Sequence, residues 1–136
     1  GFKVVSNVKN YNISEIITEG DKKINYFLKN KLIINSNNGN ENLVKLNINT
    51  EKFKSIKEKN LNNQITKYEI NVETQVEYVI LSNGLSDKFT LSKSGSYEVA
   101  SRHSETLNNE KNLINLLIND LSKGILDKLT ALLNDL

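Results

Sequence analysis

The sequence predicts a single α+β domain: a two-layer sandwich in which about four mostly antiparallel strands are covered by two helices, in the order β-α-β-β-β-α. Residues 67–81 alternate apolar and polar side chains with a period of two, as in a strand with one buried face. Shorter segments before and after it alternate in the same way. Near the C-terminus, large aliphatic residues recur every three or four positions, as in an amphipathic helix. At 136 residues the chain is long enough to bury a core.

The strand at residues 67–81 is the element around which the others are organised. One of its faces carries β-branched and aromatic residues, namely Tyr68, Ile70, Val72, Thr74, Val76, Tyr78 and Ile80. The opposite face is rich in acids, with Glu69, Glu73 and Glu77. A strand of this length needs sheet neighbours and a covering layer. We therefore expect its apolar face to lie against helices and its acidic face to lie in solvent.

The N-terminal third supplies one strand and the first helix. We expect residues 1–10 to form a polar tether and residues 11–136 to form the domain. Residues 11–19 alternate as a strand, and Gly20 ends it. Asp21 can cap a helix over residues 21–34, in which Ile24, Phe27, Leu28 and Leu32 share one face. An Asn-rich loop over residues 35–42 follows.

The remaining chain is expected to form a three-stranded meander and the second helix. A strand from Val44 to about Ile56 and the strand at 67–81 form a long hairpin that turns at residues 60–63. A fourth strand follows around Phe89, with a bulge or bend at Gly95. The closing helix carries the Leu and Ile stripe from 113 to 136, and Gly124 within it could permit a close contact with the sheet.

Several kinds of chemistry are disfavoured by the residues present. The chain has no Cys, which excludes disulfides and thiolate metal sites, and its single His103 argues against a multi-histidine metal site. The glutamates of the 67–81 strand are spaced roughly 13 Å apart, too far to act as a catalytic pair. Ser101 and Ser104 flank His103, but this segment is better explained as a helix entry. We therefore expect no enzymatic activity, no metal and no cofactor.

One cationic cluster is the candidate binding site: Lys52, Lys54, Lys57 and Lys59, with Lys67 just across the turn. Alternation places Lys52 and Lys54 on one side of the strand, with Lys57 and Lys59 offset if a bulge intervenes. Clustered ammonium groups can bind phosphates. Nucleic acid is a weaker candidate, because arginine and interleaved aromatic residues are nearly absent there. The alternative is that these lysines are a solvated surface that blocks edge-to-edge aggregation.

Short matches along nearly the whole chain resemble one protein family. They are Gly1-Phe2 at the start, Phe27, Leu28 and Leu32 in the first helix, Tyr78-Val79-Ile80-Leu81, Gly95-Ser96-Tyr97 before a Ser-rich segment, and the closing Ile/Leu-rich helix. In these the sequence resembles LptE, the outer-membrane lipoprotein family of lipopolysaccharide assembly, most closely its short alphaproteobacterial members. Mature members begin with a lipidated Cys followed by Gly-Phe, and that Cys is absent from this sequence.

The resemblance implies a non-enzymatic lipoprotein anchored by an N-terminal lipid on the periplasmic side of the outer membrane. It would plug and stabilise the LptD β-barrel and bind lipopolysaccharide. On this basis we expect Lys52, Lys54, Lys57, Lys59 and Lys67 to contact lipopolysaccharide. We expect Val4, Val5, Tyr11, Asn38 and Asn83 to lie along the barrel wall. The alternative is a periplasmic adaptor or small-ligand-binding domain of similar α/β architecture.

Overall fold

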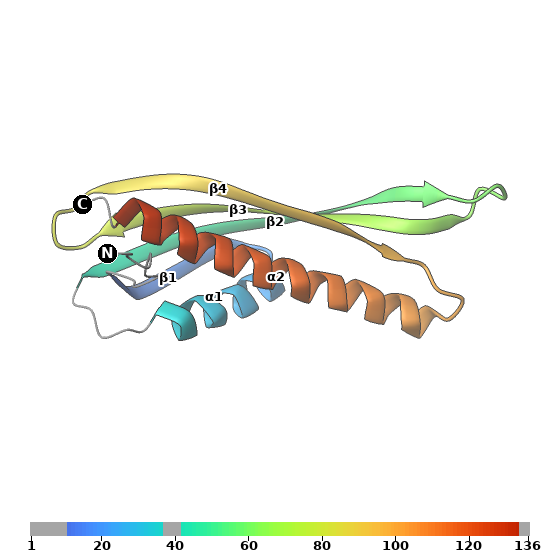
Figure 1. Cartoon of the computed structure of the whole chain (residues 1–136), viewed down its shortest axis with the longest axis horizontal. Coiled ribbons are helices and arrows are strands. Elements are labelled where there is room, and N and C mark those ends of the chain that lie inside the picture. The colour runs from blue at the N-terminus through green and yellow to red at the C-terminus, as the bar shows by residue number, and fades with distance from the viewer. Residues whose placement is uncertain (1–10, 37–41, 134–136) are drawn as a thin grey trace, which may run out of the picture.

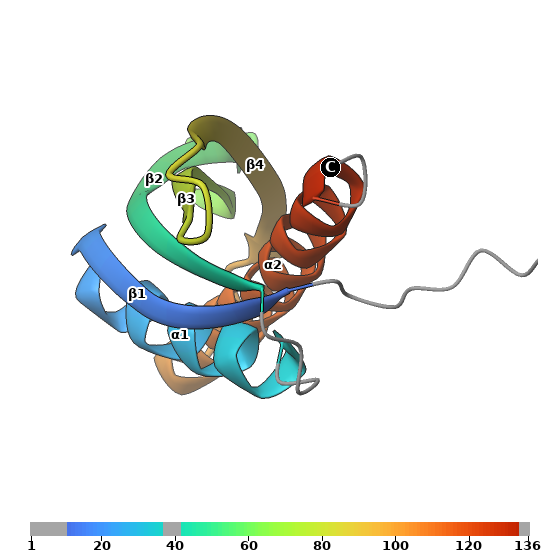
Figure 2. The same cartoon turned by 90° about the vertical axis from the view of Figure 1, so that its left-hand side faces the viewer.

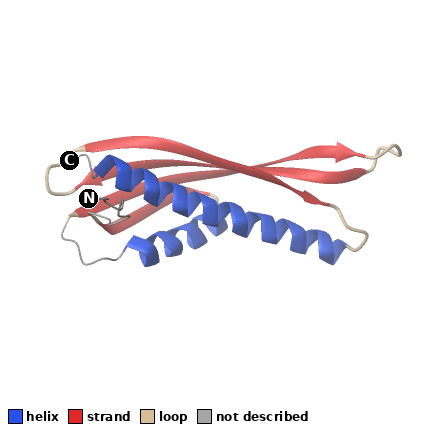
Figure 3. Ribbon diagram, in the orientation of Figure 1, coloured by secondary structure: helices blue, strands red, loops and turns tan. Residues whose placement is uncertain are grey.

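The computed structural model describes residues 11–36 and 42–133 and confirms the predicted α+β class. The elements of this part of the chain are β1 (Asn12–Gly20), α1 (Lys22–Ser36), β2 (Leu43–Lys59), β3 (Ile65–Ile80), β4 (Ser86–Glu98) and α2 (His103–Leu133). The four strands form one sheet; in Figure 1 and Figure 3, α1 lies at the bottom of the view and α2 runs between α1 and β4. The tether expected at residues 1–10 lies outside the described residues.

The strands are arranged in sequence order, β1-β2-β3-β4. The last three form the predicted antiparallel meander, whereas β1 pairs parallel with β2. Parallel neighbours need a crossover connection, and α1 provides it. Figure 2 looks along the molecule and shows a strongly curved sheet with α1 beside β1 and α2 beside β4. The sheet is therefore mixed, with a single parallel pair at one edge.

The alternation of β3 produces the expected buried and exposed faces. Ile70, Val72 and Val76 are fully buried against the helices, while Glu73 and Glu77 on the other face are exposed. The buried row includes Thr74, whose hydroxyl is 3.3 Å from that of Thr50 on β2. The two hydroxyls satisfy each other inside an otherwise apolar layer, which removes most of the cost of burying them.

The apolar stripe of α2 packs into the same core. Its buried residues recur at three- and four-residue spacing and include Leu117, Ile118, Leu121, Ile125 and Leu129. A Cβ at Gly124 would lie 3.2 Å from Cδ1 of Leu91 on β4, so this glycine does allow a close approach of the helix to the sheet.

Of the bulge or bend expected at Gly95, the bulge is wrong. The pairing of β3 with β4 runs through Gly95 opposite Ile70 without a register shift. A Cβ at Gly95 would come within 2.6 Å of Cδ1 of Leu113 on α2. A Cβ at this position would displace the end of the Leu113 side chain, so the glycine allows a close approach of α2 at a regular position of the strand.

The corner at Gly20 sets where β1 stops. Gly20 has a φ of +93°, and a Cβ there would lie 2.0 Å from the carbonyl oxygen of Thr50. The next residue, Asp21, donates its backbone N–H to that oxygen at 2.8 Å. Its carboxylate accepts the N–H of Ile24 at 2.9 Å, which is the helix cap expected from the sequence. The chain therefore turns from β1 into α1 at the level of Thr50.

This corner divides the hairpin of β2 and β3 into two parts. Up to Thr50, β2 lies between β1 and β3, and its helix-facing residues are buried. Beyond Thr50, β2 has β3 as its only strand neighbour among the described residues. We call residues 51–69 the arm. It extends past α1 toward the right of Figure 1.

Candidate functional site

The arm is a hairpin closed by its own hydrogen bonds. Residues 51–64 are all exposed. At the tip, the Asn60 N–H donates to the carbonyl of Gln64 at 2.9 Å. The side-chain oxygen of Asn60 accepts the N–H groups of Asn62 and Gln64 at 2.9 and 3.0 Å. Asparagine is common in turns because it makes such local bonds. The chain therefore turns at residues 60–63, as predicted, and the turn is closed by hydrogen bonds of Asn60.

The strand offset expected between the two lysine pairs is present. The register of β2 with β3 shifts between Ile56 and Glu58, so that Lys57 is the extra residue of a bulge. Beyond the bulge, Glu58 pairs with Lys67, and their side chains form an ion pair at 3.8 Å. Thr66 donates its hydroxyl to the same carboxylate at 2.8 Å.

The five candidate lysines are in three places. Lys52 and Lys54 continue the helix-facing row of β2 after Thr50. Lys67 lies on the opposite face of β3, because the ring of its neighbour Tyr68 lies on the helix side beneath Lys54. Lys57 and Lys59 are exposed at and beyond the bulge, and they have no ion pair among the residues that the structure describes. The structure therefore brings Lys52 and Lys54 together but does not gather all five lysines into one patch.

Lys54 is held by a cluster of side chains that we call the Lys54 clamp: Lys54, Tyr68, Tyr97 and Glu110. The ammonium of Lys54 lies 3.0 Å from the Oε2 atom of Glu110 and 4.5 Å from the centroid of the Tyr68 ring. Tyr97 donates its hydroxyl to the same Oε2 at 3.0 Å and stacks on Tyr68 with centroids 5.6 Å apart. The clamp joins the arm to α2, so Lys54 has a structural contact in addition to any ligand it binds.

The protonation of the clamp follows from these contacts. The hydrogen bond with Tyr97 raises the pKa of Lys54, and the bond with Glu110 adds to that effect against a smaller effect of burial. Burial alone would raise the pKa of Glu110, but hydrogen bonds from Lys54 and Tyr97 outweigh it and lower that pKa below its usual value. The charge of nearby Lys52 acts in the same direction. Glu110 is therefore ionised and Lys54 protonated at neutral pH.

The position of Glu110 in the sequence indicates that it faces the sheet, although Glu110 was not among the predicted site residues. Glu110 lies three, four and seven positions before Leu113, Ile114 and Leu117, so it continues the apolar stripe of α2. An acid in that row has to face either solvent or a cation of the sheet. Its partner on the helix-facing row of β2 is Lys54.

Tyr11 does not lie on the surface expected to face a barrel. It is 1% exposed, and its hydroxyl donates to the carbonyl of Leu126 on α2 at 3.2 Å. Burial raises the pKa of Tyr11, which keeps its hydroxyl protonated. The expectation of a barrel contact is wrong for this residue because its ring completes the core where β1 begins.

The other expected barrel contacts divide into described and undescribed residues. Asn83 lies in the exposed turn between β3 and β4, where its side-chain oxygen accepts the N–H of Leu85 at 2.9 Å. This turn is at the end of the molecule opposite the arm tip (Figure 1). Val4, Val5 and Asn38 lie outside the described residues.

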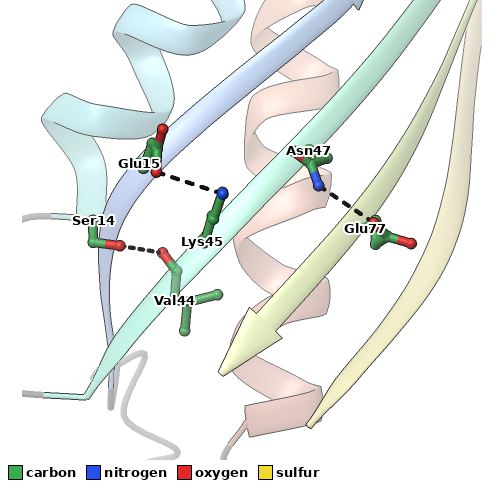
Figure 4. A network of polar contacts seen from close by, with 6 residues as sticks. All are labelled: Ser14, Glu15, Val44, Lys45, Asn47 and Glu77. Carbon is green, nitrogen blue, oxygen red and sulfur yellow. Dashed lines mark hydrogen bonds and ion pairs between the residues drawn. The ribbon is translucent and has the colours of Figure 1, made fainter. Parts of the chain in front are cut away.

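The uncovered face of the sheet is polar and paired across its strands. Lys45 on β2 lies 3.7 Å from Glu15 on β1, and Asn47 donates to Glu77 on β3 at 3.3 Å (Figure 4). Ser14 also donates its hydroxyl to the carbonyl of Val44 at 3.3 Å. Glu77 thus has a cross-strand partner, which fits the solvated acidic face predicted for β3.

The described residues hold neither a cluster of metal-ligating side chains nor a helix able to cross a membrane. Within 11–36 and 42–133, no three side chains of the metal-ligating types lie close enough together to hold an ion. None of the described helices has the length and apolar content required to cross a bilayer.

Comparisons with known proteins establish the fold. The sequence matches no protein-family model and no curated protein. Solved structures do match. A protein from Caulobacter crescentus assigned as a lipoprotein has a TM-score of 0.64 over 90% of each chain, at 14% identity. Lipoprotein B from Nitrosomonas europaea has a TM-score of 0.59 at 13% identity, over 98% of this chain and 93% of that one.

Rare lipoprotein B from Shewanella oneidensis is a further match, with a TM-score of 0.54 at 11% identity, over 90% of this chain and 95% of that one. The fold of this domain is therefore one that bacterial lipoproteins share. At these identities the likeness is one of fold alone.

Proposed function

We propose that this domain belongs to a non-enzymatic lipoprotein, anchored by an N-terminal lipid on the periplasmic face of the outer membrane. It would bind lipopolysaccharide and plug and stabilise an LptD-like β-barrel in lipopolysaccharide assembly. The observation that carries the proposal is the arm, a hydrogen-bonded hairpin that extends past α1 and exposes Lys57 and Lys59. The lipoprotein fold and the sequence resemblance to the LptE family support the same function.

The placement of the lysines refines the proposed contact with lipopolysaccharide. Phosphate groups are bound best by cations that have no competing partner, because an existing ion pair must first be broken. Lys54 is occupied by Glu110, and Lys67 by Glu58. We therefore assign the main phosphate contact to Lys57 and Lys59, with Lys52, Lys54 and Lys67 in supporting positions.

The lipopolysaccharide contact is tested with a charge-neutralised arm. Lys57→Gln/Lys59→Gln should weaken lipopolysaccharide binding about tenfold, equivalent to about 1.4 kcal/mol, because two charge-assisted contacts are lost. The loss should shrink in high salt, which screens exposed charges. Lys123→Gln/Lys128→Gln on the exposed side of α2 is the matched control, with the same charge change away from the arm. Equal weakening by both variants would show that only net charge matters and would refute the site.

The barrel contact is tested by purifying the acylated full-length protein in mild detergent. Recovery of an LptD-like barrel in a one-to-one ratio is the expected result. A photo-crosslinking residue at position 83 should label the barrel in the same preparation. Recovery of the lipoprotein alone would refute the barrel partnership and would favour the periplasmic adaptor or small-ligand-binding alternative.

A further inference from the structure

A groove lies between the start of α1 and the N-terminal half of α2, next to the base of the arm. Its volume is about 670 Å³, within the usual range of sites for small molecules. In Figure 1, α1 begins beside the middle of α2, and α2 alone continues beneath the outer part of the sheet. The groove therefore lies at the N-terminal end of α1, beyond which α2 is the only helix beside the sheet among the described residues.

The floor and walls of the groove are apolar. Ile24 and Ile118, which are 2% and 1% exposed, belong to the core and form its floor. Phe27 on α1 and Leu107 on α2 line the same groove and remain 41% and 51% exposed. Ile114, which follows Leu107 by seven positions on α2, is partly buried and also lines the groove. Large apolar side chains that are exposed to solvent and line the same groove favour binding of an apolar ligand.

The polar lining of the groove has an excess of available positive charge. It contains the acids Asp21 and Glu110: Glu110 is paired with Lys54, whereas Asp21 accepts the uncharged N–H of Ile24. It also contains three cations, Lys23, Lys52 and Lys111. None of the three has an ion pair with any described residue. A ligand group that approached them would therefore be favoured if it were anionic.

We propose that this groove binds an anionic amphiphile with a single acyl chain. The chain lies against Phe27, Leu107 and Ile114, and the carboxylate or phosphate head group is held by Lys23, Lys52 and Lys111. Lys52 is suited to this role because it is the first helix-facing residue of β2 beyond the buried Thr50. This site is separate from Lys57 and Lys59 at the end of the arm, and it requires no barrel partner.

The test is calorimetric titration of the 136-residue chain with dodecyl phosphate and dodecanoate below their micelle concentrations. One molecule of at least one of them should bind per chain, and the preferred head group distinguishes a phosphate from a carboxylate ligand. Dodecyl maltoside, which has the chain without the charge, should bind at least tenfold more weakly. Inorganic phosphate, which has the charge without the chain, should show no binding at the same concentrations.

Variants locate the site. Lys52→Gln/Lys111→Gln should weaken binding of the anionic amphiphile about tenfold and leave dodecyl maltoside unaffected. Phe27→Ala/Leu107→Ala should weaken every chain-bearing ligand. Because all four residues are at the surface of the groove, we expect the thermal midpoints of these variants to stay close to that of the parent, and this is checked first.

Two controls separate this site from the arm and from net charge. Lys57→Gln/Lys59→Gln and Lys123→Gln/Lys128→Gln should both bind dodecyl phosphate and dodecanoate as the parent does. The proposal is overturned if neither anionic amphiphile binds, or if the arm variant loses as much affinity as the groove variant. Because these ligands are tested without barrel or lipopolysaccharide, failure here would leave the proposed function untouched, and failure of the arm test would leave the groove untouched.

Discussion

The two halves of the β2–β3 hairpin have similar backbone pairing but opposite surroundings. In the inner half, β2 lies between β1 and β3, and the helix-facing residues Val44, Leu46 and Ile48 are at most 2% exposed. In the arm, the same row continues as Lys52 and Lys54 beside an open edge. The change occurs at Thr50, where Gly20 ends β1 and the chain turns into α1. One short strand and one helix therefore decide which part of β2 is core and which part is available for binding, whereas on β3 the buried row continues to Ile70.

The largest expected effect tests the contrast in burial directly. Leu46→Ala in the inner half should lower the free energy of unfolding by about 4 kcal/mol, because it leaves a cavity at a fully buried site. Phe53→Ala on β2 of the arm, where the ring is 49% exposed, should cost about 1 kcal/mol or less. Denaturant unfolding of both variants measures the difference. Comparable losses would mean that the arm is as tightly packed as the core.

The next effect concerns the corner that separates the halves. Gly20→Ala should cost about 3 kcal/mol, since its Cβ would meet the Thr50 carbonyl and its φ is positive. Gly84→Ala is the matched control: its φ of +72° is also positive, but no atom lies within 4 Å of the added carbon. It should cost about 1 kcal/mol. If urea unfolding showed the same loss of unfolding free energy in both variants, the effect of Gly20→Ala would come from the positive φ alone. The contact of the added Cβ with the Thr50 carbonyl would then contribute nothing.

A smaller effect is expected from the hydroxyl pair at the boundary. Thr74→Val should cost about 1.5 kcal/mol, because it leaves the buried hydroxyl of Thr50 without its partner. Adding Thr50→Val should recover most of that loss, since both polar groups are then replaced by apolar groups of the same shape. A double-mutant cycle measured by thermal unfolding gives the coupling. Additive losses would show that the two hydroxyls do not interact.

The smallest effect should come from the Lys54 clamp, which is partly exposed. The pKa of Glu110 is lower in the folded chain than its usual value of 4.5. Ionised Glu110 therefore stabilises the folded chain at pH values above 4.5. This stabilisation is lost as the pH falls through the pKa that Glu110 has in the folded chain. Glu110→Gln should cost about 0.5–1 kcal/mol at pH 7, discounted because Lys54 is 41% exposed.

The pH dependence provides the readout for the clamp. Urea unfolding at pH 7 and pH 3 should show a smaller loss of stability on acidification in Glu110→Gln than in the parent. Glu105→Gln, at an exposed position in the first turn of the same helix, is the control and should retain the parent's dependence. If Glu110→Gln lost as much unfolding free energy between pH 7 and pH 3 as the parent does, the ion pair of Lys54 with Glu110 would not stabilise the contact between the arm and α2.

The sequence by itself determined features that depend on neighbours along the chain. The alternation in β3, the three- and four-residue spacing in α2, the cap at Asp21 and the turn at Asn60 were all readable, because each is a local property of a strand, helix or turn. The bulge between the lysine pairs was anticipated as a possibility and is present at Lys57. The lysine-rich arm could therefore be recognised as exposed from its composition alone.

Only the tertiary structure decided how those elements meet. It made β1 parallel to β2, buried Tyr11 against α2, paired Lys54 with Glu110, and opened the groove beside Lys52. Periodicity shows which face of an element is buried, but it does not show where a neighbouring element ends. In this protein the end of β1 at Gly20, fixed by its contact with Thr50, separates the buried part of β2 from its exposed part in the arm.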